Sequence, residues 1–148
     1  MKNKLIVLEG IDGVGKTRLA KALVQELRKK KHPAVRYESL ENKIKGFNRL
    51  KSFIKSDVSP DSSLLFYLAS AIHKSENIKK LLKRRWVICD RYLYSTLASH
   101  KVRGANISLI NWRKLPIIKP DYLFLIVVKD EIRLARVKKR KKKLIPLI

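Results

Sequence analysis

Residues 5–17 read Leu5-Ile6-Val7-Leu8-Glu9-Gly10-Ile11-Asp12-Gly13-Val14-Gly15-Lys16-Thr17, and this stretch decides the fold. Its first four residues form a continuous apolar run, which is typical of a strand buried on both faces of a parallel sheet. From Lys16 onward the pattern is helical. Apolar residues recur there at three- and four-residue spacing, at Leu19, Ala20, Leu23, Val24 and Leu27. The sequence therefore predicts a buried strand, a glycine-rich turn and an amphipathic helix that ends before Pro33.

The turn at residues 10–17 matches the phosphate-loop pattern G-x-x-x-x-G-K-[ST] at every fixed position. Glycines allow backbone N–H groups to approach phosphates closely, and the following helix directs its positive end toward them. Lys16 can reach the β- and γ-phosphates, while the Thr17 hydroxyl can bind Mg²⁺. The loop therefore predicts binding of ATP with Mg²⁺. The alternative is a glycine-rich turn without a function.

Short apolar strands alternate with helices along the rest of the chain. Further strands are predicted at 34–38, 86–89 and 122–128, the last two buried, and helices at 43–55, 62–84, 92–101 and 130–143. This alternation indicates right-handed βαβ units, and so a parallel sheet with helices on both faces. We expect an α/β protein with three layers and one domain over residues 1–148, in which ligands bind beyond the carboxyl ends of the strands.

The composition narrows the classes of partner. The chain has 148 residues, and 36 Lys and Arg against 12 Asp and Glu give a net charge of +24. Such a surface attracts phosphates of nucleotides, nucleic acids or lipids, although a lysine-rich organism would also explain it. The single cysteine, Cys89, excludes an internal disulfide. Apolar runs are too short for a signal peptide or a membrane span, so we expect a cytoplasmic protein without a membrane partner.

A second pair of candidate residues, Asp90 and Arg91, follows the predicted strand at 86–89. An aspartate at this place can bind Mg²⁺, and an arginine can contact a phosphate with two hydrogen bonds. The alternative for an isolated Asp-Arg pair is a salt-bridged turn. Beside an intact phosphate loop, we interpret the pair as part of the same site.

With these motifs the chain resembles the thymidylate kinase family. Residues 9–17 are similar to the family's E-G-x-D-G-x-G-K-[ST], and residues 86–98 to its W-V-x-x-D-R-Y-x-x-S-x-x-A. Residues 64–67, Leu-Leu-Phe-Tyr, resemble the segment that stacks on thymine, and residues 119–125 the K-P-D-L-x-x-x-L strand. The resemblance covers nearly the whole chain. It implies a P-loop NTPase fold, of which four strands are visible here and a fifth is missing.

The resemblance also implies roles for individual residues. Asp12 would contact the 3′-hydroxyl of the acceptor sugar, Arg91 would hold the acceptor phosphate, and Ser95 would line the same pocket. Phe66 would stack on the base, although a core aromatic on a long helix is the alternative. A lid at about 136–143 would supply a cation through Arg136 or Arg140; a solvated helix end or a nonspecific nucleic-acid patch is the alternative.

The expected activity is transfer of a phosphoryl group from ATP to dTMP in dTTP synthesis, by a protein that pairs as a dimer in this family. Departures from the family pattern leave open which base of the acceptor nucleotide the site prefers. The stretch 37–40 has no arginine, Ser70 stands where an arginine reads thymine, and Ser99-His100 replaces Tyr-Gln. Alternatives are a P-loop kinase for another nucleoside or small acceptor, and a catalytically impaired nucleotide- or nucleic-acid-binding relative.

Overall fold

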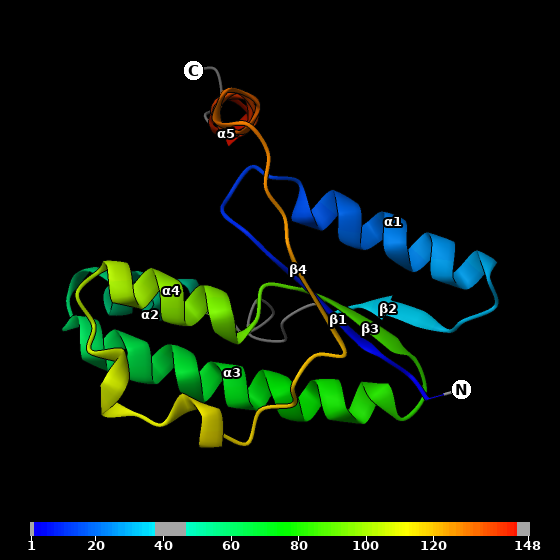
Figure 1. The fold of residues 1–148 in the computed structure, drawn as a ribbon. Helices are drawn as coiled ribbons and strands as arrows, with labels where there is room; N and C mark the ends of the chain where they lie inside the picture. The colour runs from blue at the N-terminus through cyan, green and yellow to red at the C-terminus, as the bar shows by residue number, and fades with distance from the viewer. Residues whose placement is uncertain (1, 38–46, 145–148) are drawn as a thin grey trace.

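A four-stranded parallel sheet forms the centre of the computed structural model, which describes residues 2–37 and 47–144 (Figure 1). The four strands are β1 (Leu5–Glu9), β2 (Ala34–Arg36), β3 (Trp86–Asp90) and β4 (Tyr122–Leu125). They lie in the order β2-β3-β1-β4, and all three neighbouring pairs are parallel. Val7 of β1 lies opposite Cys89 of β3 and Leu123 of β4. The predicted α/β class with a parallel sheet is confirmed.

Helices cover both faces of this sheet, as predicted. Helix α1 lies on one face, whereas α3 and α4 lie on the other (Figure 1). Helix α2 packs against α3, two short 3-10 turns lead from α4 toward β4, and α5 follows β4. The helices are α1 (Lys16–Lys29), α2 (Phe47–Ser56), α3 (Pro60–Leu82), α4 (Leu93–Val102), η2 (Ile107–Leu109), η3 (Trp112–Lys114) and α5 (Asp130–Leu144).

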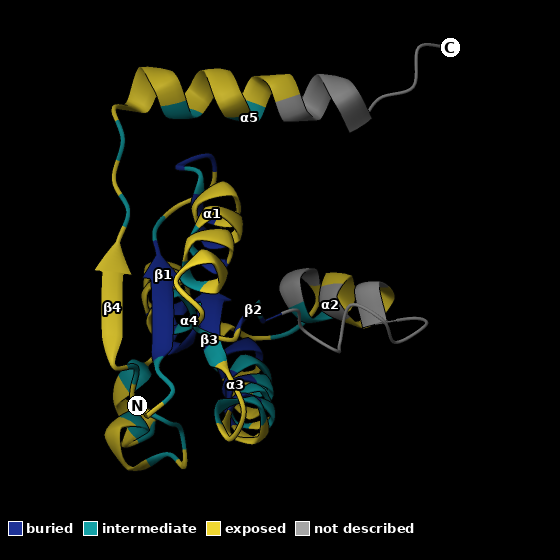
Figure 2. Ribbon diagram, turned by 90° about the vertical axis from the view of Figure 1, so that its right-hand side faces the viewer, coloured by how far each residue is buried: buried dark blue, intermediate teal, exposed yellow. Residues whose placement is uncertain are grey.

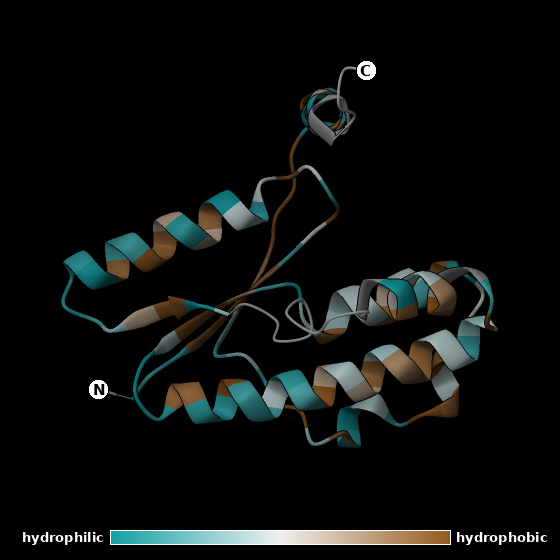
Figure 3. Cartoon of the chain, turned by 180° about the vertical axis from the view of Figure 1, so that it is seen from behind, coloured by the Kyte–Doolittle hydropathy of each residue, from teal (hydrophilic) through white to brown (hydrophobic). Residues whose placement is uncertain are grey.

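Strand β1 contributes to two hydrophobic cores, one on each face of the sheet. Leu5 and Val7 pack in the core that α3 and α4 cover, whereas Ile6 and Leu8 pack with Ala20 and other residues of α1. All residues of β1 are buried, and the inner strands appear dark blue in Figure 2 and brown in Figure 3. Successive side chains of a strand point to opposite faces, so a strand covered on both sides needs a continuous apolar run.

Strand β4 departs from the prediction of a buried strand over 122–128. It ends at Leu125, and all four of its residues are exposed, from 45% for Leu123 to 72% for Leu125. Among the described residues β4 pairs only with β1, and the helices lie over β1, β2 and β3 rather than over it (Figure 2). The apolar run correctly indicated a strand, but not that helices would cover it.

Two predicted elements reach beyond the described part of the chain. The strand expected at 34–38 is observed over Ala34–Arg36, and residue 38 lies outside the described residues. The helix expected at 43–55 corresponds to α2, with residues 43–46 likewise outside them. Across the residues that the structure describes, none of the helices combines the length and apolarity needed to cross a bilayer.

Candidate active site

The turn from β1 to α1 carries the phosphate-loop residues. Gly10, Gly13 and Gly15 all have positive φ angles, of 139°, 91° and 101°. A Cβ atom on Gly10 would lie 2.6 Å from the carbonyl oxygen of Ile126, and one on Gly13 would lie 2.9 Å from the Arg133 carbonyl oxygen. Conformation and space both require glycine at these two positions. The strand-to-helix turn that the sequence predicts at residues 10–17 is present.

Lys16 folds back over this loop. Its Nζ donates hydrogen bonds to the carbonyl oxygens of Gly10 at 2.8 Å and Ile11 at 2.9 Å, and the residue is buried. Burial lowers the pKa of Lys16, and the charge of Arg91 lowers it further, while nearby carboxylates, chiefly that of Asp90, oppose this shift. Because its two hydrogen-bond partners are uncharged, the ammonium can still neutralise an anion. Phosphate oxygens could take the place of these carbonyls.

Thr17 and Asp90 meet at the carboxyl end of the sheet. Since β1 pairs with β3, the start of α1 lies beside the end of β3, and Thr17 Oγ1 donates to Asp90 Oδ2 at 2.6 Å. A hydroxyl and a carboxylate are the oxygen ligands that Mg²⁺ prefers, usually together with water and substrate phosphates. The described residues contain no cluster of three or more His, Cys, Asp and Glu side chains that could hold a metal alone. The pair therefore fits an ion that shares its ligands with a nucleotide.

Asp12 and Arg91 form an ion pair across the entrance of the site. Arg91 Nη2 lies 2.7 Å from Asp12 Oδ1, and the two side chains are 39% and 80% exposed. Exposed pairs contribute about 0–1 kcal/mol to stability. The sequence predicted separate roles for the two residues, toward the sugar and the phosphate of an acceptor. The structure brings them into contact, and an incoming anion could compete with Asp12 for the guanidinium.

An apolar cleft with a volume of about 630 Å³ lies beside this pair, between α4 and the segment that follows β4. Small-molecule sites typically occupy ≈ 300–1,000 Å³. Arg91, Ser95, Ser99 and Arg103 line its α4 side. Arg103 is a second cation of the cleft, and no motif in the sequence indicated it. Phe66 is half-buried on α3, edge-to-face with its neighbour Tyr67, and is not among the side chains that line this cleft.

Glu9 is the clearest site residue that sequence reasoning missed. It is buried, and one carboxylate oxygen accepts from the Tyr92 amide at 3.0 Å and the Ser95 amide at 3.4 Å. The Ser95 hydroxyl, predicted to line the acceptor pocket, donates to the other oxygen. Glu9 thus connects the phosphate loop to the first turn of α4. The available signal was an acidic residue that ends a wholly apolar run.

Helix α5 crosses next to the phosphate loop, beyond the carboxyl ends of the strands (Figure 2). Arg136 Nη1 lies 3.3 Å from the carbonyl oxygens of both Gly13 and Val14, so this predicted lid cation reaches the loop backbone. Arg140 belongs to the same helix, but its side chain lies outside the described residues. Helix α5 packs closely against Gly13, where a Cβ atom would lie 2.9 Å from side-chain atoms of Arg133 and Val137. A lid at 136–143 stays a prediction.

The residues that depart from the family pattern occupy different surroundings. His100 is buried, with Nε2 3.1 Å from Ser63 Oγ and Nδ1 2.8 Å from the Thr96 carbonyl oxygen, so it joins α3 to α4 inside the core. Ser99 lines the cleft, and Ser70 is half-buried on α3. Residues 38–40, where the family has an arginine, lie outside the described residues.

A parallel sheet whose first strand ends in this loop, with a Thr-Asp pair beside it, defines a P-loop nucleotide-binding protein. Residues 8–145 match the family model for thymidylate kinase. The chain therefore belongs to the thymidylate kinase family.

Individual relatives agree with this assignment. The chain is 38% identical over 136 residues to a probable thymidylate kinase of Methanocaldococcus jannaschii, covering 92% of this chain and 70% of that protein. It is also 38% identical over 141 residues to a probable thymidylate kinase of Archaeoglobus fulgidus, covering 93% and 71%. A crystal structure of thymidylate kinase from Ehrlichia chaffeensis superposes with a TM-score of 0.65 at 27% identity, over 97% of this chain and 81% of that one.

Proposed function

We propose that this chain transfers the γ-phosphoryl group of ATP to dTMP, giving ADP and dTDP for dTTP synthesis. One observation carries the proposal: two cations contact the same loop, since Lys16 binds the carbonyl oxygens of Gly10 and Ile11, and Arg91 pairs with Asp12. This arrangement can bind a triphosphate and a second phosphate close together, as phosphoryl transfer requires. The names of the relatives support dTMP as the acceptor.

Each step of the proposed reaction uses residues of this site. An oxygen of the dTMP phosphate attacks the γ-phosphorus, and the bond from that phosphorus to the oxygen bridging to the β-phosphate breaks. Lys16 holds the β- and γ-phosphate oxygens, and Arg91 orients the attacking phosphate. Thr17 and Asp90 would hold Mg²⁺, which when bound neutralises charge on the phosphate oxygens. Arg136, already at the loop, is a candidate for further charge stabilisation.

The remaining expectations concern specificity and assembly, and they stay predictions. Without an arginine at position 70, we expect broader base preference than a site that reads thymine by that hydrogen bond, because losing such a contact relaxes discrimination. Base stacking on Phe66, a homodimer, a cytoplasmic location and weak binding to nucleic acid are further predictions. The family match does not favour a different acceptor or loss of catalysis.

The experiment is a coupled assay of ADP release over a panel of nucleoside monophosphates. We expect the highest kcat/KM with dTMP, and a loss of kcat of about 10²–10³ in Lys16→Met, because a preorganised charge at the transferring phosphoryl group is removed. Lys21→Met changes an exposed lysine of α1 and serves as the matched control, with kcat unchanged. If ATP binds but no monophosphate raises ADP release, the proposed function is wrong.

A further inference from the structure

The backbone of Arg91 adopts an unusual conformation. Its φ angle is 66°, in the left-handed region that residues with a Cβ atom rarely adopt. Such a conformation persists only when surrounding contacts hold it. The Arg91 amide donates to the Leu8 carbonyl oxygen at 3.0 Å, which attaches one side of the residue to β1. To hold the turn on its other side, the Arg91 carbonyl oxygen needs a hydrogen-bond donor.

Lys74 of α3 provides that partner. Its Nζ donates to the Arg91 carbonyl oxygen at 2.6 Å, across the interface between α3 and the end of β3. The thiol of Cys89 points at the same oxygen, with a sulfur–oxygen distance of 3.1 Å. Burial raises the pKa of Cys89, so at neutral pH it is a thiol that can donate this hydrogen bond. Two donors thus hold the carbonyl of Arg91.

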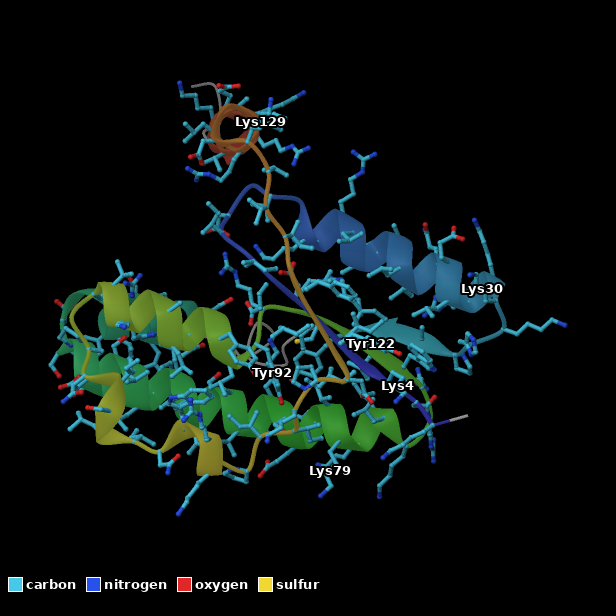
Figure 4. The ribbon with its side chains drawn as sticks, in the orientation of Figure 1. Lys4, Lys30, Lys79, Tyr92, Tyr122 and Lys129 are labelled. Atoms are coloured by element: carbon cyan, nitrogen blue, oxygen red, sulfur yellow. The ribbon has the colours of Figure 1, made fainter. Side chains whose placement is uncertain are left out.

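Two aromatic rings beside Lys74 help to hold its ammonium group in place. Nζ lies 5.3 Å from the centre of the Tyr37 ring and 5.9 Å from that of the Tyr92 ring, within reach of cation–π attraction. Tyr92 lies between α3 and the sheet in Figure 4, and burial raises its pKa to about 12, so its ring stays neutral. None of the ion pairs found among the described residues involves Lys74.

A second lysine of the same helix shows the contrast. Lys79 is exposed and extends away from the sheet in Figure 4, as a lysine on a long helix normally does. Lys74 instead is half-buried and turned toward the end of β3. A partly buried ammonium group loses contacts with water, and other contacts have to compensate for that loss. At Lys74 the Arg91 carbonyl oxygen and the two aromatic rings provide these contacts.

We propose that Lys74 is a positioning residue for the acceptor side of the site. By holding the Arg91 carbonyl it fixes the left-handed turn, and that turn directs the guanidinium toward Asp12 and the expected place of the acceptor phosphate. The proposal rests on the proposed function for its kinetic consequence. Its structural content, a Lys74-dependent orientation of Arg91, does not depend on which acceptor is used.

The test compares Lys74→Met and Lys74→Arg with the control Lys79→Met. Methionine keeps an apolar stem beside the two rings and removes the charged donor, whereas arginine restores a charged donor. In Lys74→Met we expect KM for the acceptor to rise roughly tenfold, as for loss of a charge-assisted hydrogen bond, with KM for ATP within about twofold of wild type. Lys74→Arg should recover much of the acceptor affinity, and Lys79→Met should match wild type.

Two kinetic results would overturn the proposal. One is an unchanged acceptor KM in Lys74→Met. The other is an equal rise in both KM values together with a lower melting temperature, which would indicate a packing role alone. If Lys74→Met does not fold, Lys74→Gln is the deciding variant, because its shorter and uncharged side chain also removes the ammonium donor, and the same criteria apply.

A second readout separates this proposal from the kinase proposal. The Arg91 Nε–Hε signal in ¹H–¹⁵N NMR spectra, assigned with Arg91→Lys, should shift or broaden in Lys74→Met and stay in place in Lys79→Met. If the wild-type protein phosphorylates no monophosphate, the proposed function fails, and this signal still decides the role of Lys74. An unmoved Arg91 signal in Lys74→Met would refute the positioning role.

Discussion

Replacing Glu9 with glutamine should destabilise the fold by several kcal/mol. Glu9 is 5% exposed, and its carboxylate accepts hydrogen bonds from the Tyr92 amide, the Ser95 amide and the Ser95 hydroxyl. Helix α4 has no capping side chain of its own, since its N-cap residue is Tyr92. Glu9 therefore supplies, from β1, the acceptors that a helix N-terminus needs.

The magnitude follows from what glutamine keeps and loses. Its carbonyl oxygen can still accept from both amides, but it is uncharged, and its NH₂ group replaces the oxygen that accepts from the Ser95 hydroxyl. Loss of one hydrogen bond to a charged acceptor costs about 1.5–3 kcal/mol, and loss of a negative charge at a helix N-terminus about 0.3–1 kcal/mol more. We expect a decrease of about 2–4 kcal/mol in the free energy of unfolding, a large part of the ≈ 5–15 kcal/mol of an ordinary domain.

Urea unfolding, followed by tryptophan fluorescence and circular dichroism, measures this change. Glu26→Gln is the matched control, because Glu26 is an exposed carboxylate that pairs only with Lys29 among the described residues, and its loss should leave the free energy of unfolding nearly unchanged. Because Glu9 and Ser95 share an interaction, Glu9→Gln and Ser95→Ala together should cost less than the sum of the two. A Glu9→Gln protein as stable as Glu26→Gln would refute the capping argument.

Two further predictions test the loop and the sheet edge. Gly13→Ala should weaken ATP binding and lower stability more than Gly104→Ala. Both glycines have positive φ, but only a Cβ on Gly13 would crowd Arg133, at 2.9 Å. ATP titration and urea unfolding measure the two losses, and equal losses in the two variants would contradict the prediction. At Asp121, burial raises the pKa of the carboxyl, but hydrogen bonds from Lys4 (Figure 4) and a backbone amide lower it below 3.8 overall. The ionised Asp121 carboxylate therefore stabilises the fold above the unfolded-state pKa, and this stabilisation is lost as pH falls through the lower folded-state pKa. In urea unfolding, wild type should lose more stability than Asp121→Asn between about pH 6 and pH 3. Equal losses in the two proteins would contradict this prediction.

The sequence could predict the loop, β1 and β3 because their local pattern and their final environment coincide. A run such as 86–89 is apolar throughout since both of its faces are covered, and the glycines at 10, 13 and 15 match the positive φ angles that the turn needs. The same reasoning was wrong about the burial of 122–128. An apolar run indicates that a segment prefers an apolar environment. Whether helices cover that strand depends on where the rest of the chain places them.

The contacts around Arg91 could not be predicted because they join distant segments. Glu9 and Lys74 lie 82 and 17 positions from Arg91 in the sequence, and nothing in their local pattern distinguishes Lys74 from the other lysines of α3. Their importance arises only when β1, α3 and the end of β3 come together. Phosphate-loop glycines can be recognised from one segment, but a positioning residue depends on the tertiary arrangement.

The arrangement at Arg91 combines a firmly held backbone with a weakly held side chain. Its amide is bound by Leu8, its carbonyl by Lys74 and Cys89, and the next amide by Glu9. Its guanidinium, in contrast, pairs with an exposed carboxylate, an interaction worth about 1 kcal/mol or less. A phosphate that carries more negative charge than Asp12 can displace it without moving the backbone. Because the backbone is ordered before binding, the acceptor would not have to order this turn itself, and the guanidinium could exchange one anion for another at small cost.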